Sequence, residues 1–110
     1  MSELGNIANL LLSKSEAGKV EWNVEPAKDS FSTVVDGVIM RIRYRTFSNT
    51  TAADYYFSIR SKDDHEIESY YQEAKHPDYS LLKKLYEIAR RRALRVDETL
   101  SKVERALKGL

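Results

Sequence analysis

The chain has 110 residues, of which 42% are hydrophobic and 32% are charged, and its formal net charge is +1. This composition excludes the low-hydrophobicity, high-charge class of disordered proteins, and the length suits one domain with one core, residues 1–110. The chain has no cysteine, which excludes disulfides and thiolate metal ligands and favours a reducing compartment, so we expect a cytoplasmic protein. No apolar run reaches the ~20 residues that a membrane-spanning helix needs.

The first 18 residues have the pattern of an amphipathic helix. Its predicted buried face follows the i, i+3, i+4, i+7 spacing of Leu4, Ile7, Ala8 and Leu11. Ser2 is placed to cap this helix and Gly18 to end it. Val20, Trp22 and Val24 then alternate with polar residues, which predicts a half-buried strand with the Trp22 indole in the core.

A β-hairpin is the clearest local prediction. Asp36-Gly37 supplies the positive φ angles of a type I′ turn between two runs rich in β-forming residues, 31–35 and 38–45. A two-residue loop predicts three facing pairs, whose mostly apolar side chains all lie on one face: Val35 with Val38, Thr33 with Met40, and Phe31 with Ile42.

Two further strands are predicted after the hairpin. Residues 46–53 are small and polar and indicate a loop, after which Tyr55, Phe57 and Ile59 alternate with polar neighbours in a strand. A turn at 62–65 leads to a short strand at 66–69. Residues 70–77 are expected to be irregular or to form a brief helical turn.

Residues 80–108 have a helical pattern throughout, with apolar residues spaced alternately three and four apart as in a heptad seam. A straight helix of this length measures ~43 Å, whereas a compact domain of this size is ~34 Å across, so its far end should extend beyond the core. Either the first helix covers that end, or, as we slightly favour, an antiparallel copy of the same helix does. The candidate interaction surface is Arg92, Leu94, Leu100, Val103 and Leu107.

One predicted sheet face carries basic and aromatic side chains: Arg41, Arg43, Arg45, Tyr56 and Arg60. Such a face can stack bases and contact phosphates, as single-strand-binding surfaces do. Alternating polar residues are also what the water-facing side of any antiparallel sheet shows. Nucleic-acid binding is therefore the alternative function.

Signatures of catalysis or of cofactor binding are absent from the sequence. The four glycines are too scattered for a phosphate-binding loop, and His65 and His76 fall in predicted loops without a nucleophile motif. Asp63, Asp64, His65 and Glu66 lie next to one another in a turn, without the spacing of a metal-ligand set. We therefore predict no catalytic, cofactor or metal residues and a protein that is not an enzyme.

The sequence resembles small uncharacterised prokaryotic proteins that share its layout over nearly the full chain. The similarity rests on Leu10-Leu11, on Gly18-Lys19-Val20-Glu21-Trp22, and on residues 85–91 (LYEIARR) continuing into Ala93-Leu94 and Val96-Asp97-Glu98. The chain departs from that layout at Asp63-Asp64-His65, where a glycine is more usual. Because the group has no assigned activity, the resemblance supports the fold and implies no functional residues.

The predicted fold is α+β: an N-terminal helix, an antiparallel meander of four to five strands, and a long C-terminal helix packed on one sheet face. The predicted function is a non-enzymatic interaction module, acting as a homodimer or through a protein partner and needing no cofactor.

Overall fold

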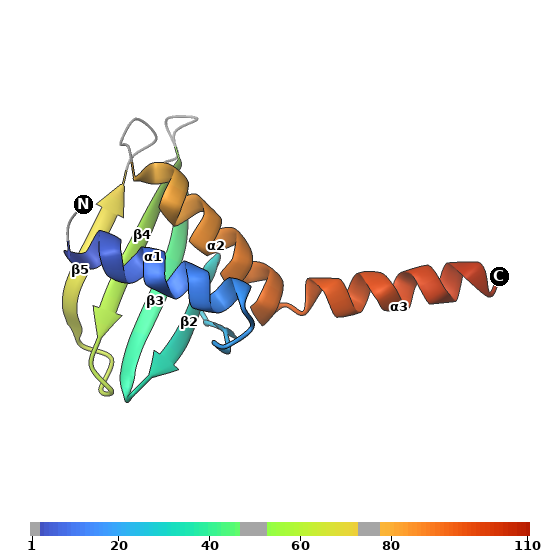
Figure 1. The fold of residues 1–110 in the computed structure, drawn as a ribbon, viewed down its shortest axis with the longest axis horizontal. Coiled ribbons are helices and arrows are strands. Elements are labelled where there is room, and N and C mark those ends of the chain that lie inside the picture. Colours follow the sequence, from blue (N-terminus) through green and yellow to red (C-terminus); the bar gives the residue numbers. More distant parts are fainter. Residues whose placement is uncertain (1–2, 47–52, 73–77) are drawn as a thin grey trace.

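The computed structural model describes residues 3–46, 53–72 and 78–110 and has the predicted α+β fold. Five antiparallel strands form one sheet in the order β1-β2-β3-β4-β5, and helices α1 and α2 lie on one of its faces (Figure 1). The elements are α1 (Glu3–Glu16), β1 (Asn23–Val24), β2 (Ser30–Val35), β3 (Val38–Thr46), β4 (Ala53–Arg60), β5 (Glu66–Gln72), α2 (Tyr79–Ala93) and α3 (Val96–Lys108).

Helix α1 packs on the sheet through the predicted face. Leu4, Ala8 and Leu11 are buried, while Ile7, on the edge of that face, is 39% exposed. Gly18 ends the helix as predicted: its φ is +73°, and the N–H groups of Gly18 and Lys19 donate to carbonyl oxygens of the last turn over 3.0 Å each. This is a Schellman motif, which needs a left-handed residue after the helix. The predicted cap, Ser2, lies outside the described residues.

The strand predicted at residues 20–24 is only two residues long. Asn23 and Val24 pair with β2, but Val24 is exposed, so the prediction that Val20, Trp22 and Val24 share one buried face is wrong. Trp22 itself is buried, as predicted. Its indole N–H donates to the Ser15 hydroxyl. This contact holds the segment between α1 and β1 against the end of α1.

The hairpin forms in the predicted register. Asp36 and Gly37 have φ angles of +52° and +76°, and the three predicted pairs all face each other. The face toward the helices buries Phe31, Thr33, Met40 and Ile42, while Val35 remains partly exposed near the turn.

The last two strands continue the meander. Tyr55 and Phe57 are buried under the helices and Ile59 is partly buried, as the alternation predicted. Strand β5 runs to Gln72, so the prediction of irregular structure from residue 70 is wrong for residues 70–72; pairing with β4 extends the strand, with an irregularity between Ile59 and Arg60. Residues 47–52 of the predicted loop, and residues 73–77 including His76, lie outside the described residues.

The predicted continuous C-terminal helix is broken into two. Helix α2 buries Leu82, Leu85, Tyr86 and Ala89 against the sheet and α1, and α3 then leaves the body as a projecting arm (Figure 1). Arg95, between them, has a left-handed φ of +53°, which ends α2 without a glycine or proline. The radius of gyration, 15.3 Å, exceeds the ~13 Å of a compact 110-residue domain, because α3 projects from the body.

An aromatic cluster joins α2 to the sheet. The rings of Tyr44, Tyr55 and Tyr86 lie within 5.3 to 5.6 Å of one another, and Phe31 and Tyr79 extend the group. Burial raises the pKa of Tyr86 to about 12, and the neighbouring Asp29 carboxylate adds to this rise. Burial also raises the pKa of Tyr55. Within the described residues, no helix is long and apolar enough to cross a membrane.

Candidate interaction surface

Helix α3 has an apolar stripe that its own domain leaves uncovered. The stripe consists of Leu100, Val103, Leu107 and Leu110, and no residue of α3 is buried. Leu100 is 57% exposed, Val103 48% and Leu107 63%. The predicted extension beyond the core is confirmed, and the described structure places all of α3 beyond the core.

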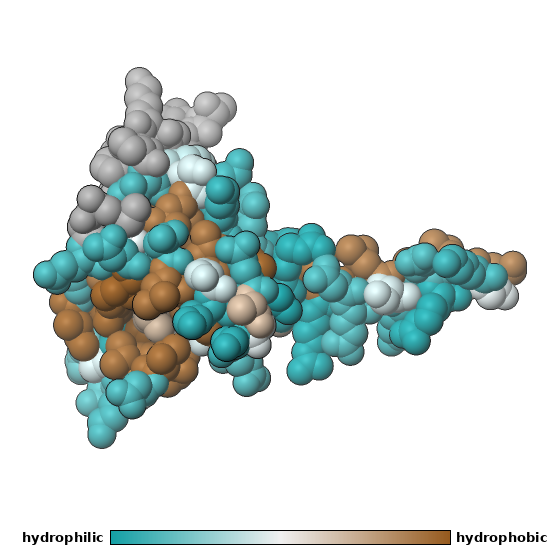
Figure 2. All heavy atoms as spheres, viewed as in Figure 1, coloured by the Kyte–Doolittle hydropathy of each residue, from teal (hydrophilic) through white to brown (hydrophobic). Residues whose placement is uncertain are grey.

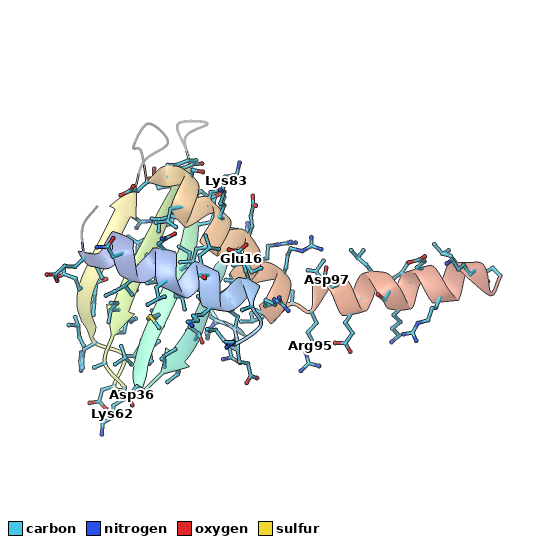
Figure 3. The ribbon with its side chains drawn as sticks, in the orientation of Figure 1. Glu16, Asp36, Lys62, Lys83, Arg95 and Asp97 are labelled. Carbon is cyan, nitrogen blue, oxygen red and sulfur yellow. The ribbon has the colours of Figure 1, made fainter. Side chains whose placement is uncertain are left out.

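The stripe continues the apolar seam of α2, although the helix is interrupted. The three-and-four spacing runs from Leu82 through Ala93 and Val96 to Leu110 without a change of phase. At the junction, Arg91 forms an ion pair with Asp97, and Arg95 approaches Glu98 with 3.6 Å between Nη1 and Oε2. Figure 3 shows Arg95 and Asp97 at the base of the projecting helix.

The α2–α3 junction also contains the two other residues of the predicted surface. Leu94 is 44% exposed, as expected for the polar side of the helix. The Arg92 side chain is exposed, and its Nη2 donates to the Glu16 carbonyl oxygen over 3.5 Å. A helix C-terminus offers unpaired carbonyl groups of partial negative charge, which explains this choice of partner.

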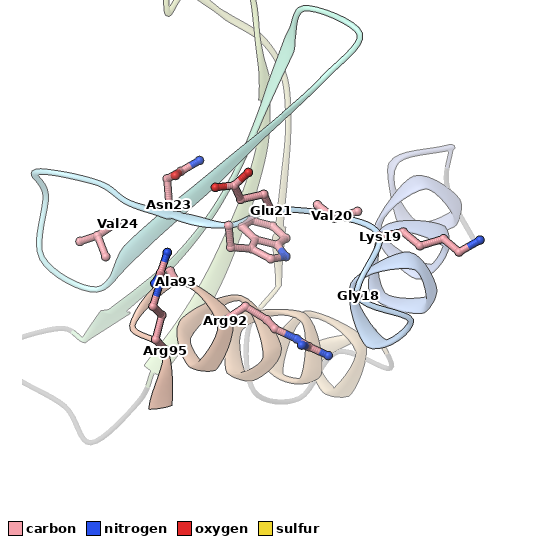
Figure 4. A pocket seen from close by; sticks show the side chains of 10 residues that line it. Gly18, Lys19, Val20, Glu21, Asn23, Val24, Arg92, Ala93 and Arg95 are labelled. Atoms are coloured by element: carbon pink, nitrogen blue, oxygen red, sulfur yellow. The ribbon is translucent and has the colours of Figure 1, made fainter. Parts of the chain in front are cut away.

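A polar pocket of ≈ 450 Å³ lies beside the junction, between α2 and the segment that follows α1 (Figure 4). Its lining includes Trp22, Glu21, Arg92 and Arg95, and Lys19 points away from it. Arg92 binds a carbonyl oxygen and Arg95 lies near Glu98, so both arginines of this pocket already have partners within the chain.

The first helix does not cover the stripe. The apolar face of α1, with Leu4, Ala8 and Leu11, belongs to the core formed with the sheet and α2. The prediction that the first helix covers the stripe is therefore wrong for the described structure.

A second apolar surface, which the sequence did not indicate, runs along one side of α1. Two adjoining hollows, of ≈ 520 and ≈ 180 Å³, share Ile7 in their linings. We call this surface the α1 groove; its apolar lining includes Ile7, Leu10, Val35, Met40, Ile59 and Ile67. Figure 2 shows apolar atoms gathered over the part of the sheet that the helices leave uncovered.

The sheet face opposite the helices carries the predicted basic side chains, but most of them are paired. Arg41 Nη2 lies 3.3 Å from Glu25 Oε1 and 3.0 Å from Asp64 Oδ1, and Arg60 Nε lies 2.7 Å from that same Asp64 oxygen. The hydrogen bond from Arg60 lowers the pKa of Asp64 below its ordinary value. Acidic residues thus neutralise this part of the face.

The remaining members of that face are Arg43, Arg45 and Tyr56. The Arg45 guanidinium lies over the Tyr56 ring, 5.0 Å from its centroid, and the Tyr56 hydroxyl donates to Glu66. Arg43 is exposed, and within the described ranges no ion pair to it is found. The predicted five residues do share a face, and the structure brings them together.

The acidic turn has a structural role. Asp64 binds Arg41 and Arg60, and Glu66 binds Tyr56. The carboxylates of Asp64 and Glu66 therefore point toward basic and hydroxyl partners. Over residues 3–46, 53–72 and 78–110, no group of three or more potential ligands is placed to hold a metal ion.

Comparison of the chain with known protein families, with curated proteins and with solved structures finds no match. The function must therefore be argued from the geometry of these surfaces.

Proposed function

We propose that this chain is a non-enzymatic interaction module of the cytoplasm that associates with a second copy of itself through the stripe of α3. The observation that supports this most strongly is a helix of 13 residues whose apolar side chains are all in contact with water. An isolated helix shorter than ~12–15 residues is only marginally stable in water. A helix of this length with an apolar face is therefore expected to gain its stability from a partner.

Self-association is favoured by the sequence of α3. Its first half carries Asp97 and Glu98, a charge of −2, whereas residues 102–108 carry three basic and one acidic side chain, a charge of +2. A second copy of α3, or another element with the reverse order of charges, matches this polarity. Two-fold association is the commonest way in which soluble chains assemble.

The energetics favour a weak dimer if only the stripe is covered. About half of the Leu100, Val103 and Leu107 side chains remains to be buried, which is worth about 1 kcal/mol per residue, or about 6 kcal/mol for these three residues in each of two copies. Association itself costs at least ~4 kcal/mol. The difference of about 2 kcal/mol is too small for a dimer at micromolar concentration, so the surface that the stripe contacts must itself bury apolar area.

The test is multi-angle light scattering over a range of concentrations. We expect twice the monomer mass for the wild type and the monomer mass for a Leu100→Glu, Leu107→Glu double variant that keeps its fold. Ser101→Glu places the same charge on α3 away from the stripe and should leave the dimer intact. A wild type that is monomeric at high micromolar concentration contradicts the proposal, and so does a double variant that remains a folded dimer.

Nucleic-acid binding is supported less well. Arg41 and Arg60 are held by carboxylates, and the Tyr56 ring is covered by Arg45, so base stacking and phosphate contacts have to displace existing interactions.

A further inference from the structure

We infer that the α1 groove of one copy receives the α3 arm of a second copy, so that two chains exchange arms reciprocally. This inference rests on the proposed function and identifies the surface that the stripe contacts. In this arrangement the stripe and the α1 groove, two apolar surfaces that the described structure leaves exposed, cover each other.

The wall of the groove is one side of α1. Glu3, Ile7, Leu10 and Lys14 follow the i, i+4, i+7, i+11 spacing of a single helix row and line the two hollows in that order. The floor is the sheet, where Met40 and Ile59 are directly paired across β3 and β4. A helix lying here would complete the layer that α1 and α2 begin.

The arm and the groove have matching lengths. Helix α3 has 13 residues and α1 has 14, which correspond to about 20 and about 21 Å. The stripe repeats every three or four residues, as an amphipathic helix needs in order to lie in an apolar groove.

Charges at the two ends of the groove set the direction of the arm. Glu3 and Glu68 lie at one end, and Lys14 lies at the other. An arm antiparallel to α1 places its acidic first turn, with Asp97 and Glu98, beside Lys14. Its basic last turns, with Arg105 and Lys108, then lie beside the two glutamates.

The groove is filled from a second copy rather than from the same chain. In the described structure α3 leaves the body from the end of α2 and points away from the groove of its own chain (Figure 1). The left-handed conformation of Arg95 turns the chain at this point, and Arg91 forms an exposed ion pair with Asp97 across the junction. Reciprocal exchange keeps both features.

The decisive experiment is complementation between two variants. Leu10→Glu damages the groove and Leu107→Glu damages the arm, and light scattering should find each variant alone to be monomeric. Mixed together, they should form a heterodimer, because the arm of the first fits the groove of the second. Asn9→Glu, on the exposed side of α1 away from the groove, should leave the dimer intact.

The outcomes separate this inference from the proposed function. If Leu10→Glu remains dimeric while Leu107→Glu is monomeric, the stripe binds a surface other than the α1 groove. That result contradicts this inference and leaves the proposed self-association standing. If the wild type is monomeric, both fail. If the mixture stays monomeric, reciprocal exchange is contradicted.

Cross-linking covers the case in which Leu10→Glu does not fold. The chain has no cysteine, so introduced thiols report on one contact only. Under mild oxidation, a Leu10→Cys chain mixed with a Val103→Cys chain should form a mixed disulfide dimer. A Val103→Cys chain that instead cross-links only to itself overturns the groove in favour of paired α3 helices. If a chain with both substitutions forms only an internal disulfide, α3 binds the α1 groove of its own chain, and exchange between copies is contradicted.

Discussion

The indole N–H of Trp22 donates a hydrogen bond to the hydroxyl oxygen of Ser15 over 2.9 Å, and both side chains are buried. This contact fixes the segment after α1 against the last turn of that helix. We predict that Trp22→Ala lowers the free energy of unfolding by ~3–5 kcal/mol, since it empties a large core site. Ser15→Ala should cost ~1–3 kcal/mol, because it leaves a buried donor unpaired. Urea unfolding measures both, and a Trp22→Ala value under 1 kcal/mol would contradict the burial.

Replacing Arg95 tests the break between α2 and α3. Arg95 adopts a left-handed conformation, which costs a non-glycine residue roughly 1 kcal/mol, and its contact with Glu98 is exposed and worth little. We therefore predict that Arg95→Gly stabilises the protein by about 0.5–1 kcal/mol in urea unfolding.

The sign of the change in stability on Arg95→Gly distinguishes a helix that is broken at residue 95 from a continuous one. If residues 80–108 form one continuous helix in solution, glycine at position 95 costs about 1 kcal/mol instead. Lys84→Gly, at an exposed position within α2, provides the matched control and should be destabilising in either case. Destabilisation of equal size in both variants would show that the break is absent.

Stability at alkaline pH should depend on Tyr86. Its pKa is about 12 in the folded protein and about 10 in an unfolded chain, so the folded state holds the proton more tightly. The resulting stabilisation is complete below pH 10 and is lost as pH rises from about 10 to about 12. Urea unfolding across this range should give a shallower fall for Tyr86→Phe than for the wild type. Identical pH profiles would show that Tyr86 titrates normally.

The sheet face should bind single-stranded nucleic acid weakly or not at all at physiological salt, because Glu25, Asp64 and Glu66 already pair with Arg41 and Arg60. Fluorescence anisotropy with a labelled oligonucleotide tests this. Tight, salt-sensitive binding that is lost in an Arg43→Ala, Arg60→Ala variant would instead favour the nucleic-acid function.

Local signals in the sequence were sufficient for much of the fold. Asp36-Gly37 specified the hairpin register, and the alternation at residues 55–59 specified the face of β4 that packs under the helices. The break at Arg95 was not predictable, because the apolar spacing keeps its phase through it and neither glycine nor proline marks it. The partner of Arg92 could not be identified from the sequence, because it is a backbone carbonyl group, which every residue has.

The candidate site was predicted only in part. The exposure of Leu100, Val103 and Leu107 could be predicted from the heptad spacing, because an apolar seam of this length extends beyond a domain of this size. The α1 groove combines side chains from α1, the hairpin, β4 and β5, and only the packed sheet shows which of them the helices leave uncovered. Ile67, in an irregular part of β5, has no signal in the sequence that marks it as part of a surface.

Hydrogen exchange of the α3 amides as a function of protein concentration tests the central claim most directly. If a second copy covers the stripe, the amides of residues 99–107 should be protected at high concentration and should lose that protection on dilution, while amides of β3 stay protected throughout. Protection of α3 that does not change with concentration, whether present or absent, would contradict self-association through this helix.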